Sequence, residues 1–182
     1  MKDIMDYIYG RRSIRSFTDQ EVDSKQIDLL LKAAMAAPSS CDRKPWEYVV
    51  ISEENILKKI EKYLDNEAYS PKLAIVVCGN MDLANCTECE GMKGECSGFW
   101  IQDCSASMEN ILLAASGLGL GSVWIGAYPI TGIVKFLSET LNLPANIIPL
   151  SIAYIGYSNE LIEPRTQYDA AKVHMESYKA NS

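Results

Sequence analysis

The sequence predicts a single domain in which helices pack around a small β-sheet. Several segments carry apolar residues at helical spacing, and they alternate with short, continuously apolar runs that are typical of buried strands. There is no internal repeat, no low-complexity linker and no second core, and 182 residues are enough to bury one substantial core. On propensity alone, strands separated by helices favour a parallel, doubly wound sheet.

The first quarter of the chain carries two helical patterns. Residues 3–9 form a short one, with Ile4 and Ile8 on one face. The second begins near Asp23, because Asp23 and Gln26 have the spacing of a capping residue and its reciprocal partner. Its apolar residues recur at helical spacing until a proline ends the pattern: Ile27, Leu30, Leu31, Ala34 and Met35, followed by Pro38.

Strands are predicted at four apolar runs. Residues 73–78 are continuously apolar, which is typical of a central strand. Residues 48–51 and 122–125 are shorter runs of the same kind, and residues 147–157 form the last and longest. These four segments are the expected sheet.

Three more helices are expected, over residues 54–64, 99–116 and 133–141. The helix over 99–116 is the longest, and Gly117 and Gly119 end it because glycine tolerates the left-handed conformation found at helix C-termini. Its inward positions are predicted to be Ile101, Cys104, Met108, Ile111, Leu112 and Ala115.

Composition and charge exclude several classes of function. A net charge of −7 disfavours nucleic acid, whose phosphates require a basic surface. No apolar run reaches the about 18 residues that a membrane-spanning helix needs. The first residues lack the apolar region of an export signal. We therefore expect a cytoplasmic protein with no nucleic-acid or membrane partner.

Three of the six cysteines, Cys86, Cys89 and Cys96, lie in a polar, glycine-containing segment. The C-x2-C pair resembles half of a zinc or iron–sulfur site. Only three thiols lie close together, and the single histidine, His174, is far away in the sequence. We favour a surface loop with reduced thiols, and metal binding by these cysteines is the alternative.

The segment from Arg11 to Phe17 concentrates positive charge in an acidic protein. Arg11, Arg12 and Arg15 are accompanied by the hydroxyl of Ser13. Guanidinium groups present forked donors that match a phosphate, and neighbouring hydroxyl and N–H groups can complete the cradle. No G-x-G-x-x-G motif opens a strand–turn–helix unit and no P-loop motif occurs. The segment therefore indicates a local site for one small anionic ligand.

Two further segments, residues 37–48 and 117–126, contain the sequences APSSCDRKPWEY and GLGLGSVWIG. Together with the arginine segment, and in the same order and separation, they resemble the FMN-dependent nitroreductase family. The resemblance covers nearly the whole chain. It implies an α+β nitroreductase-like fold, with a mainly antiparallel central sheet flanked by helices, instead of a parallel sheet. It also implies an interlocked homodimer, in which residues 158–182 form a C-terminal arm that wraps the partner subunit.

The resemblance also implies a binding site for FMN. In the family pattern, the residues that match Arg11, Arg12, Ser13 and Arg15 hold the FMN phosphate and reach the pyrimidine edge of the flavin. Arg15 is the better match for the N1/O2 edge, where a cation stabilises the charge of the reduced flavin. Arg165 resembles the final phosphate contact of the family.

The second segment resembles the part of the family pattern that lines the flavin from the partner subunit. Pro38, Ser39 and Ser40 match it, but Asp42 replaces the usual asparagine and Lys44 the usual glutamine. An ionised Asp42 can only accept hydrogen bonds. Either Arg43 or Lys44 screens its charge, or the side chain turns outward.

The third segment resembles a strand end that passes over one face of the flavin, through Ile125, Gly126 and Ala127. Gly126 or Ala127 can bring a backbone N–H to the flavin N5, because small residues allow close approach. No Ser-His-Asp set is found, so we expect no catalytic side chain and assign the redox chemistry to the cofactor.

The function implied by the resemblance is that of an FMN-dependent NAD(P)H oxidoreductase. Hydride from NADH or NADPH would reach the flavin N5 in a ping-pong cycle, and a nitroaromatic, a quinone or a similar small molecule would be the electron acceptor. One alternative is a specialised flavin enzyme for dehalogenation or flavin breakdown. The other is a flavin- or metal-binding sensor that uses the Cys86–Cys96 loop.

Overall fold

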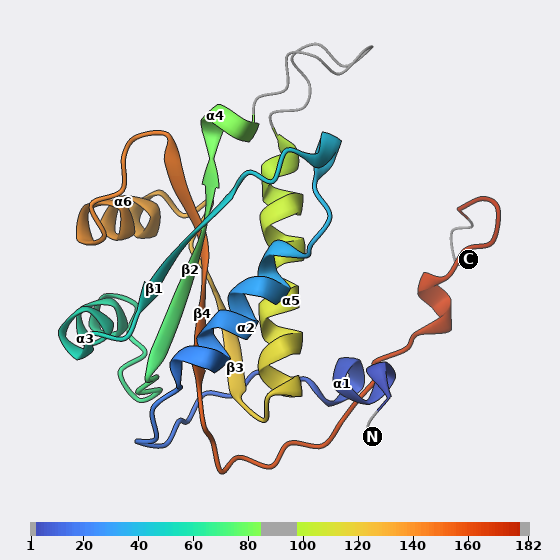
Figure 1. Cartoon of the computed structure of the whole chain (residues 1–182). Coiled ribbons are helices and arrows are strands. Elements are labelled where there is room, and N and C mark those ends of the chain that lie inside the picture. Colours follow the sequence, from blue (N-terminus) through green and yellow to red (C-terminus); the bar gives the residue numbers. More distant parts are fainter. Residues whose placement is uncertain (1–2, 85–97, 179–182) are drawn as a thin grey trace.

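The computed structural model describes residues 3–84 and 98–178. It contains one four-stranded sheet with the order β1-β2-β4-β3 (Figure 1). The strands are β1 (Trp46–Ile51), β2 (Leu73–Asn80), β3 (Gly121–Gly126) and β4 (Ile147–Gly156). Every pairing between these four strands is antiparallel, so the mainly antiparallel sheet implied by the resemblance is confirmed and the parallel sheet favoured by propensity is wrong.

Helices cover both faces of this sheet. The helices of the described residues are α1 (Ile4–Gly10), α2 (Ser24–Met35), α3 (Glu54–Tyr63), α4 (Met81–Ala84), α5 (Phe99–Gly117) and α6 (Thr131–Thr140), and 3-10 turns occur at η1 (Ser40–Asp42) and η3 (Ala170–Lys172). The pair α2 and α5 packs on one face, and α3 and α6 pack on the other (Figure 1). The short helix α4 was not predicted from the sequence.

The two layers divide the side chains of β2 between two cores. Leu73, Ile75 and Val77 face the α2–α5 layer, whereas Ala74 and Val76 face the α3–α6 layer. Because both faces are covered, the strand lacks the polar alternation that antiparallel strands usually show. This explains why the run over 73–78 resembles a strand of a parallel sheet.

The caps predicted from the sequence are present. Asp23 accepts a hydrogen bond from the Gln26 N–H at 2.9 Å, and the Gln26 side chain accepts one from the Asp23 N–H at 3.3 Å. At the end of α5, Gly119 has a φ of +75°. The Leu120 N–H donates to the Ala115 carbonyl at 2.8 Å, which completes a Schellman motif. Gly119 is thus the terminating glycine, and Gly117 is the last residue of the helix.

The predicted inward face of α5 is buried at Cys104, Met108, Ile111, Leu112 and Ala115, and Ile101 is half-buried. Other predicted apolar positions are not covered within this chain. Met35 at the end of α2 is 54% exposed, and Ile4 and Ile8 on α1 are also exposed.

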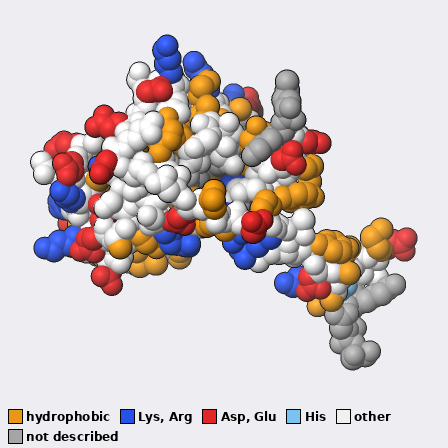
Figure 2. All heavy atoms as spheres, turned by 90° about the horizontal axis from the view of Figure 1, so that it is seen from below, with side chains coloured by type: hydrophobic (Ala, Val, Ile, Leu, Met, Phe, Trp, Pro, Cys, Tyr) orange, Lys and Arg blue, Asp and Glu red, His pale blue; other side chains and the backbone are white. Residues whose placement is uncertain are grey.

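The segment after β4 runs beside α1 and then projects away from the body of the protein (Figure 1). The Arg165 N–H donates to the Tyr9 carbonyl at 3.1 Å, which ties the segment to α1. Beyond this bond, hydrophobic side chains gather on the projecting part (Figure 2). The exposed ones are Tyr168, Val173, Met175 and Tyr178. In the described ranges, no helix has both the length and the apolar character to span a membrane.

Candidate functional site

The arginine segment lies along the free edge of β3. The Ile14 N–H donates to the Ser122 carbonyl at 2.9 Å, and Ser13 forms a parallel bridge with Ser122. Gly121 makes this contact possible, because a Cβ there would lie 2.8 Å from Cγ2 of Ile14. The segment is therefore held against the start of an edge strand through its backbone, which leaves its side chains available for other contacts.

The guanidinium groups of the segment are held by different partners. Arg11 Nε lies 3.4 Å from Oε1 of Glu109 on α5. Arg12 donates from Nη1 to the carbonyl of Glu163, and Arg15 donates from Nη1 to the Ser13 carbonyl at 3.5 Å. Burial raises the pKa of the Glu109 carboxyl, and the charge of Arg11 opposes that rise.

Arg11 and Arg12 line a pocket of about 260 Å³, which we call the arginine pocket. Its lining comes from the end of α1, the end of α5, the start of β3 and the segment after β4: Gly10, Arg11, Arg12, Ile14, Ser116, Gly119, Leu120, Gly121, Ser122, Ser158, Glu160, Leu161 and Ile162. Of the phosphate ligands predicted in the arginine segment, Arg11 and Arg12 therefore line this pocket, whereas Ser13 and Arg15 do not.

Glu160 also lines the arginine pocket and was not identified from the sequence. Its Oε1 accepts a hydrogen bond from the Arg15 N–H at 3.2 Å, and its own N–H donates to Ser158 Oγ at 3.0 Å. A carboxylate here holds the backbone of the arginine segment in place. No motif marked this residue, because its role depends on how the segment after β4 returns past α1.

The segment from Pro38 to Lys44 folds into the turn η1 with unusual backbone angles. Cys41, Asp42 and Lys44 have φ values of 50°, 55° and 50°, in the left-handed region that favours glycine. Lys44 Nζ lies 2.9 Å from Oδ2 of Asp42, and both side chains are exposed. Lys44 therefore screens Asp42, and the pair faces outward. Ser39 Oγ accepts the Lys44 N–H at 2.9 Å.

A buried carboxylate anchors this turn to α5. Oδ1 of Asp103 accepts a hydrogen bond from the Ser40 N–H at 2.9 Å, and Asp103 is only 8% exposed. Burial raises the pKa of Asp103, and the Ser40 N–H opposes that rise. Asp103 was missed in the sequence. The available signal was an acidic residue beside Cys104, on the apolar face of a long helix.

The structure does not bring the first two motifs together within one chain. The turn η1 is tied to Asp103 near the start of α5, whereas the arginine pocket includes Ser116 near its end. These two residues are 13 positions apart, which corresponds to about 20 Å along a helix. Pro38, Ser39, Ser40 and Asp42 therefore lie at one end of α5, and the arginine segment lies at the other.

At the end of β3, the backbone N–H groups of Gly126 and Ala127, which are the two candidates for the flavin N5, differ in their hydrogen bonding. The Ala127 N–H donates to the Leu150 carbonyl at 3.0 Å, so it is not available to a ligand, and this part of the prediction is corrected. Antiparallel hydrogen bonds alternate along a strand, and Gly126 is the neighbour of Ala127 in that register. The N–H of Gly126 therefore points away from β4. Gly126 is exposed, and a Cβ there would meet nothing within 4 Å. Ile125 beside it is half-buried.

Of the two other predicted sites, Arg165 lies within the described residues and the cysteine loop lies outside them. Arg165 is exposed and lies next to α1, where its N–H bonds Tyr9. Cys86, Cys89 and Cys96 lie outside the described residues, so the prediction for their loop stays a prediction. In the described ranges, no group of three or more His, Cys, Asp or Glu side chains could hold a metal ion.

The sequence profile of the Nitroreductase family matches residues 8–76 and 97–157, which contain the arginine segment, the turn η1 and β3. The chain belongs to the Nitroreductase family. The resemblance expected from the three motifs is thereby confirmed. The two matched ranges leave out the cysteine loop and the segment after β4.

Individual members of the Nitroreductase family are similar over nearly the whole chain. A protein of Methanothermobacter thermautotrophicus with the provisional name NADH dehydrogenase/NAD(P)H nitroreductase is 36% identical, over 97% of this chain and 88% of that protein. The FMN reductase [NAD(P)H] of Bacillus subtilis is 27% identical, over 98% of this chain and 75% of that protein. The solved structure of an FMN-dependent nitroreductase from Clostridium difficile has a TM-score of 0.81 and 29% identity, and the match covers 96% of this chain and 99% of that one.

Proposed function

We propose that this protein is an FMN-dependent NAD(P)H oxidoreductase. Its relatives include NAD(P)H nitroreductases and FMN reductases, which supports this type of reaction. The observation that carries the assignment is the edge of β3. The arginine segment is attached to the start of that strand, and the outward N–H of Gly126 lies at its end.

The residues present fit FMN. Arg11 and Arg12 supply forked donors in the arginine pocket, where a terminal phosphate could accept them. The space at Gly126 is open enough for the face of a flat ring, because no atom of the described residues, apart from its chain neighbours, lies within 4 Å of a Cβ placed there. Arg15 belongs to the same segment as Arg11 and Arg12 and is exposed, so it is the cation that we assign to the pyrimidine edge of the flavin.

Bound FMN supplies the redox chemistry, by taking hydride from NAD(P)H and passing electrons to an acceptor such as a nitroaromatic or a quinone. The chain contributes binding and electrostatics. The Gly126 N–H would be a hydrogen-bond donor for N5 of bound FMN, and a fixed cation such as Arg15 at the pyrimidine edge would favour negative charge there. No side chain of the chain is assigned as a general acid or base.

The proposed active enzyme is a homodimer with two sites, each built from both chains. The separation of about 20 Å along α5 supports this arrangement, because η1 of one subunit can then meet the arginine segment of the other. Apolar side chains that this chain leaves exposed also support it: Ile4, Met5, Ile8, Tyr9, Leu29 and Met35, together with those of the projecting segment. Obligate interfaces bury about 2,000 Å² or more and are rich in such side chains.

The assignment is tested on the purified protein. Released cofactor is identified by mass, and NAD(P)H consumption is followed with a nitroaromatic as acceptor. We expect FMN, and activity that Arg12→Ala reduces by weakening FMN binding. Lys135→Ala is the control, because Lys135 is an exposed cation on α6 that pairs only with Glu139, at 3.9 Å, among the ion pairs of the described residues. FAD in place of FMN, or no flavin after reconstitution, would refute the assignment.

The shared site is tested separately by light scattering at decreasing protein concentration. We expect dilution to release FMN and to dissociate the dimer together, since the stability of such dimers is tied to protomer concentration. A monomer that retains stoichiometric FMN would rule out a site made from two chains, and would leave the enzymatic assignment intact.

A further inference from the structure

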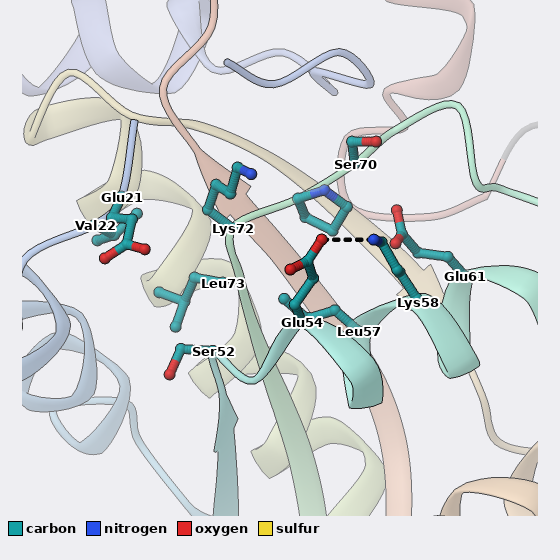
Figure 3. A pocket seen from close by; sticks show the side chains of 11 residues that line it. Glu21, Val22, Ser52, Glu54, Leu57, Lys58, Glu61, Ser70, Lys72 and Leu73 are labelled. Carbon is teal, nitrogen blue, oxygen red and sulfur yellow. Dashed lines mark ion pairs between the residues drawn. The ribbon is translucent and has the colours of Figure 1, made fainter. Parts of the chain in front are cut away.

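A second cavity lies between α3 and the loop before β2. We call it the Glu61 cavity. It has a volume of about 230 Å³ (Figure 3). This is far more than one water molecule needs, and it is below the about 300–1,000 Å³ of pockets for drug-sized ligands. Val22, Leu57, Pro71 and Leu73 give it an apolar wall.

One carboxylate in this cavity is buried and incompletely bonded. Glu61 is 4% exposed, and its Oε1 has no hydrogen-bond partner among the residues that the structure describes. Its side chain extends from α3 toward the loop that carries Ser70 (Figure 3). A buried acceptor without a donor costs about 1–3 kcal/mol, and more if it is charged. The cavity therefore contains an acceptor that a bound donor would stabilise.

The charged and polar groups around Glu61 do not compensate for the burial of its carboxyl. Burial is the largest influence and raises the pKa of Glu61. The Ser70 N–H lowers that pKa, Glu67 raises it, and Lys58 and Lys72 lower it more weakly. The neighbouring donors therefore do not compensate for the loss of water around the carboxyl.

Both lysines of the cavity have carboxylate partners of their own. Lys58 Nζ lies 2.5 Å from Oε1 of Glu54, on the same helix (Figure 3). Lys72 Nζ lies 3.0 Å from Oδ1 of Asp19, which is outside the cavity lining. The cations are thus neutralised locally. The lining also contains Glu21, which is exposed, so Glu61 is the buried carboxylate of this lining that a ligand of opposite charge can reach.

We propose that the Glu61 cavity binds a small organic cation, a primary ammonium group on a short apolar body. The ammonium group donates to Oε1 of Glu61, and the apolar body packs against Leu57 and Leu73. A charge-assisted hydrogen bond from the ammonium group would give the unbonded carboxylate oxygen the donor that it lacks. The cavity shares no lining residue with the arginine pocket, and the proposal does not rest on the proposed redox function.

The test is calorimetric titration of the full-length protein with pentylammonium, with 1-pentanol and pentanoate as neutral and anionic probes of the same length. We expect saturable binding of pentylammonium, at least about tenfold tighter than that of either other probe. Glu61→Gln should weaken it by a similar factor. Glu139→Gln should leave it unchanged, because Glu139 is an exposed glutamate on α6.

Equal affinity for 1-pentanol, unchanged affinity in Glu61→Gln, or no saturable binding would overturn the proposal. If Glu61→Gln does not fold, the wild-type protein decides through the ¹³C resonance of the Glu61 carboxyl. Pentylammonium should shift that resonance and lower the pKa it reports, since the bound cation favours the ionised form. A resonance and a pKa that do not move would also overturn the proposal.

Discussion

The contact between Gly121 and Ile14 offers the sharpest test of how the arginine segment is held. A Cβ at Gly121 would lie 2.8 Å from Cγ2, 3.0 Å from Cβ and 3.1 Å from Cγ1 of Ile14. Carbon atoms pack best at about 3.5–4.0 Å. Rotating the Ile14 side chain cannot relieve the contact with its own Cβ, because that atom moves only with the backbone. Gly121→Ala must therefore push the segment away from β3.

The expected cost has two parts. Overpacking of this kind costs about 1–3 kcal/mol. Loss of the 2.9 Å bond from the Ile14 N–H to the Ser122 carbonyl adds about 0.5–1.5 kcal/mol. We therefore expect Gly121→Ala to lower the free energy of unfolding by about 2–4 kcal/mol. At about 2–4 °C for each kcal/mol in a chain of this size, Tm should fall on the order of 5–15 °C.

The assay is urea unfolding at fixed protein concentration, together with FMN titration of the folded variant. Gly117→Ala is the matched control, since Gly117 is the last residue of α5 and a Cβ there meets nothing within 4 Å. Alanine should be neutral or stabilising at that position. A Gly121→Ala protein as stable as Gly117→Ala, with unchanged FMN affinity, would refute the reasoning.

Three further predictions follow from the same structure. Asp103→Ala should cost about 1–3 kcal/mol by leaving the Ser40 N–H without its acceptor, whereas Asp103→Asn should retain most of the stability, as measured by urea unfolding. Gly126→Ala should leave Tm unchanged but weaken FMN binding measured by fluorescence, because its methyl group enters open space where the flavin is proposed to lie; unchanged binding would place the flavin elsewhere. The folded-state pKa of Glu61 is raised, so the folded protein binds more protons than the unfolded one, and stability should fall as pH rises from about 4.3 through the folded pKa. Glu61→Gln should flatten that part of the pH–stability curve, and an unchanged slope would contradict this assignment.

Most helices, strands and helix caps of this protein could be predicted from the sequence. The Asp23–Gln26 cap, the termination of α5 at Gly119 and the strand over 73–78 depend on neighbouring residues, and all three are present. Propensity did not predict the direction of strand pairing. Helices bury both faces of the sheet, so the strands lack the alternation of polar and apolar residues that is typical of antiparallel sheets. The resemblance carried by the three motifs supplied the correct topology.

Only part of the candidate site could be predicted from the sequence, because the rest depends on contacts between segments that are far apart in the chain. The residue types of the arginine segment are enough by themselves to indicate a small anionic ligand. The choice of Gly126 over Ala127 depends on which N–H already bonds Leu150, and this is decided by the register between β3 and β4. Asp103 and Glu160 act on backbone groups far away in the sequence, so their partners could not be predicted from a local pattern.

The sequence by itself predicted most of the helices and all four strands, and where α2 begins and α5 ends, and it indicated which cluster of cations is the candidate for binding a phosphate. These properties depend on spacing and on side-chain chemistry within a few residues. The tertiary structure alone decided that η1 and the arginine segment lie at opposite ends of α5, and that Glu61 is enclosed beside Leu57 and Leu73 with one oxygen that no described residue bonds. Both facts arise from long-range packing, which fixes the distance and the solvent exposure of groups that the sequence places far apart.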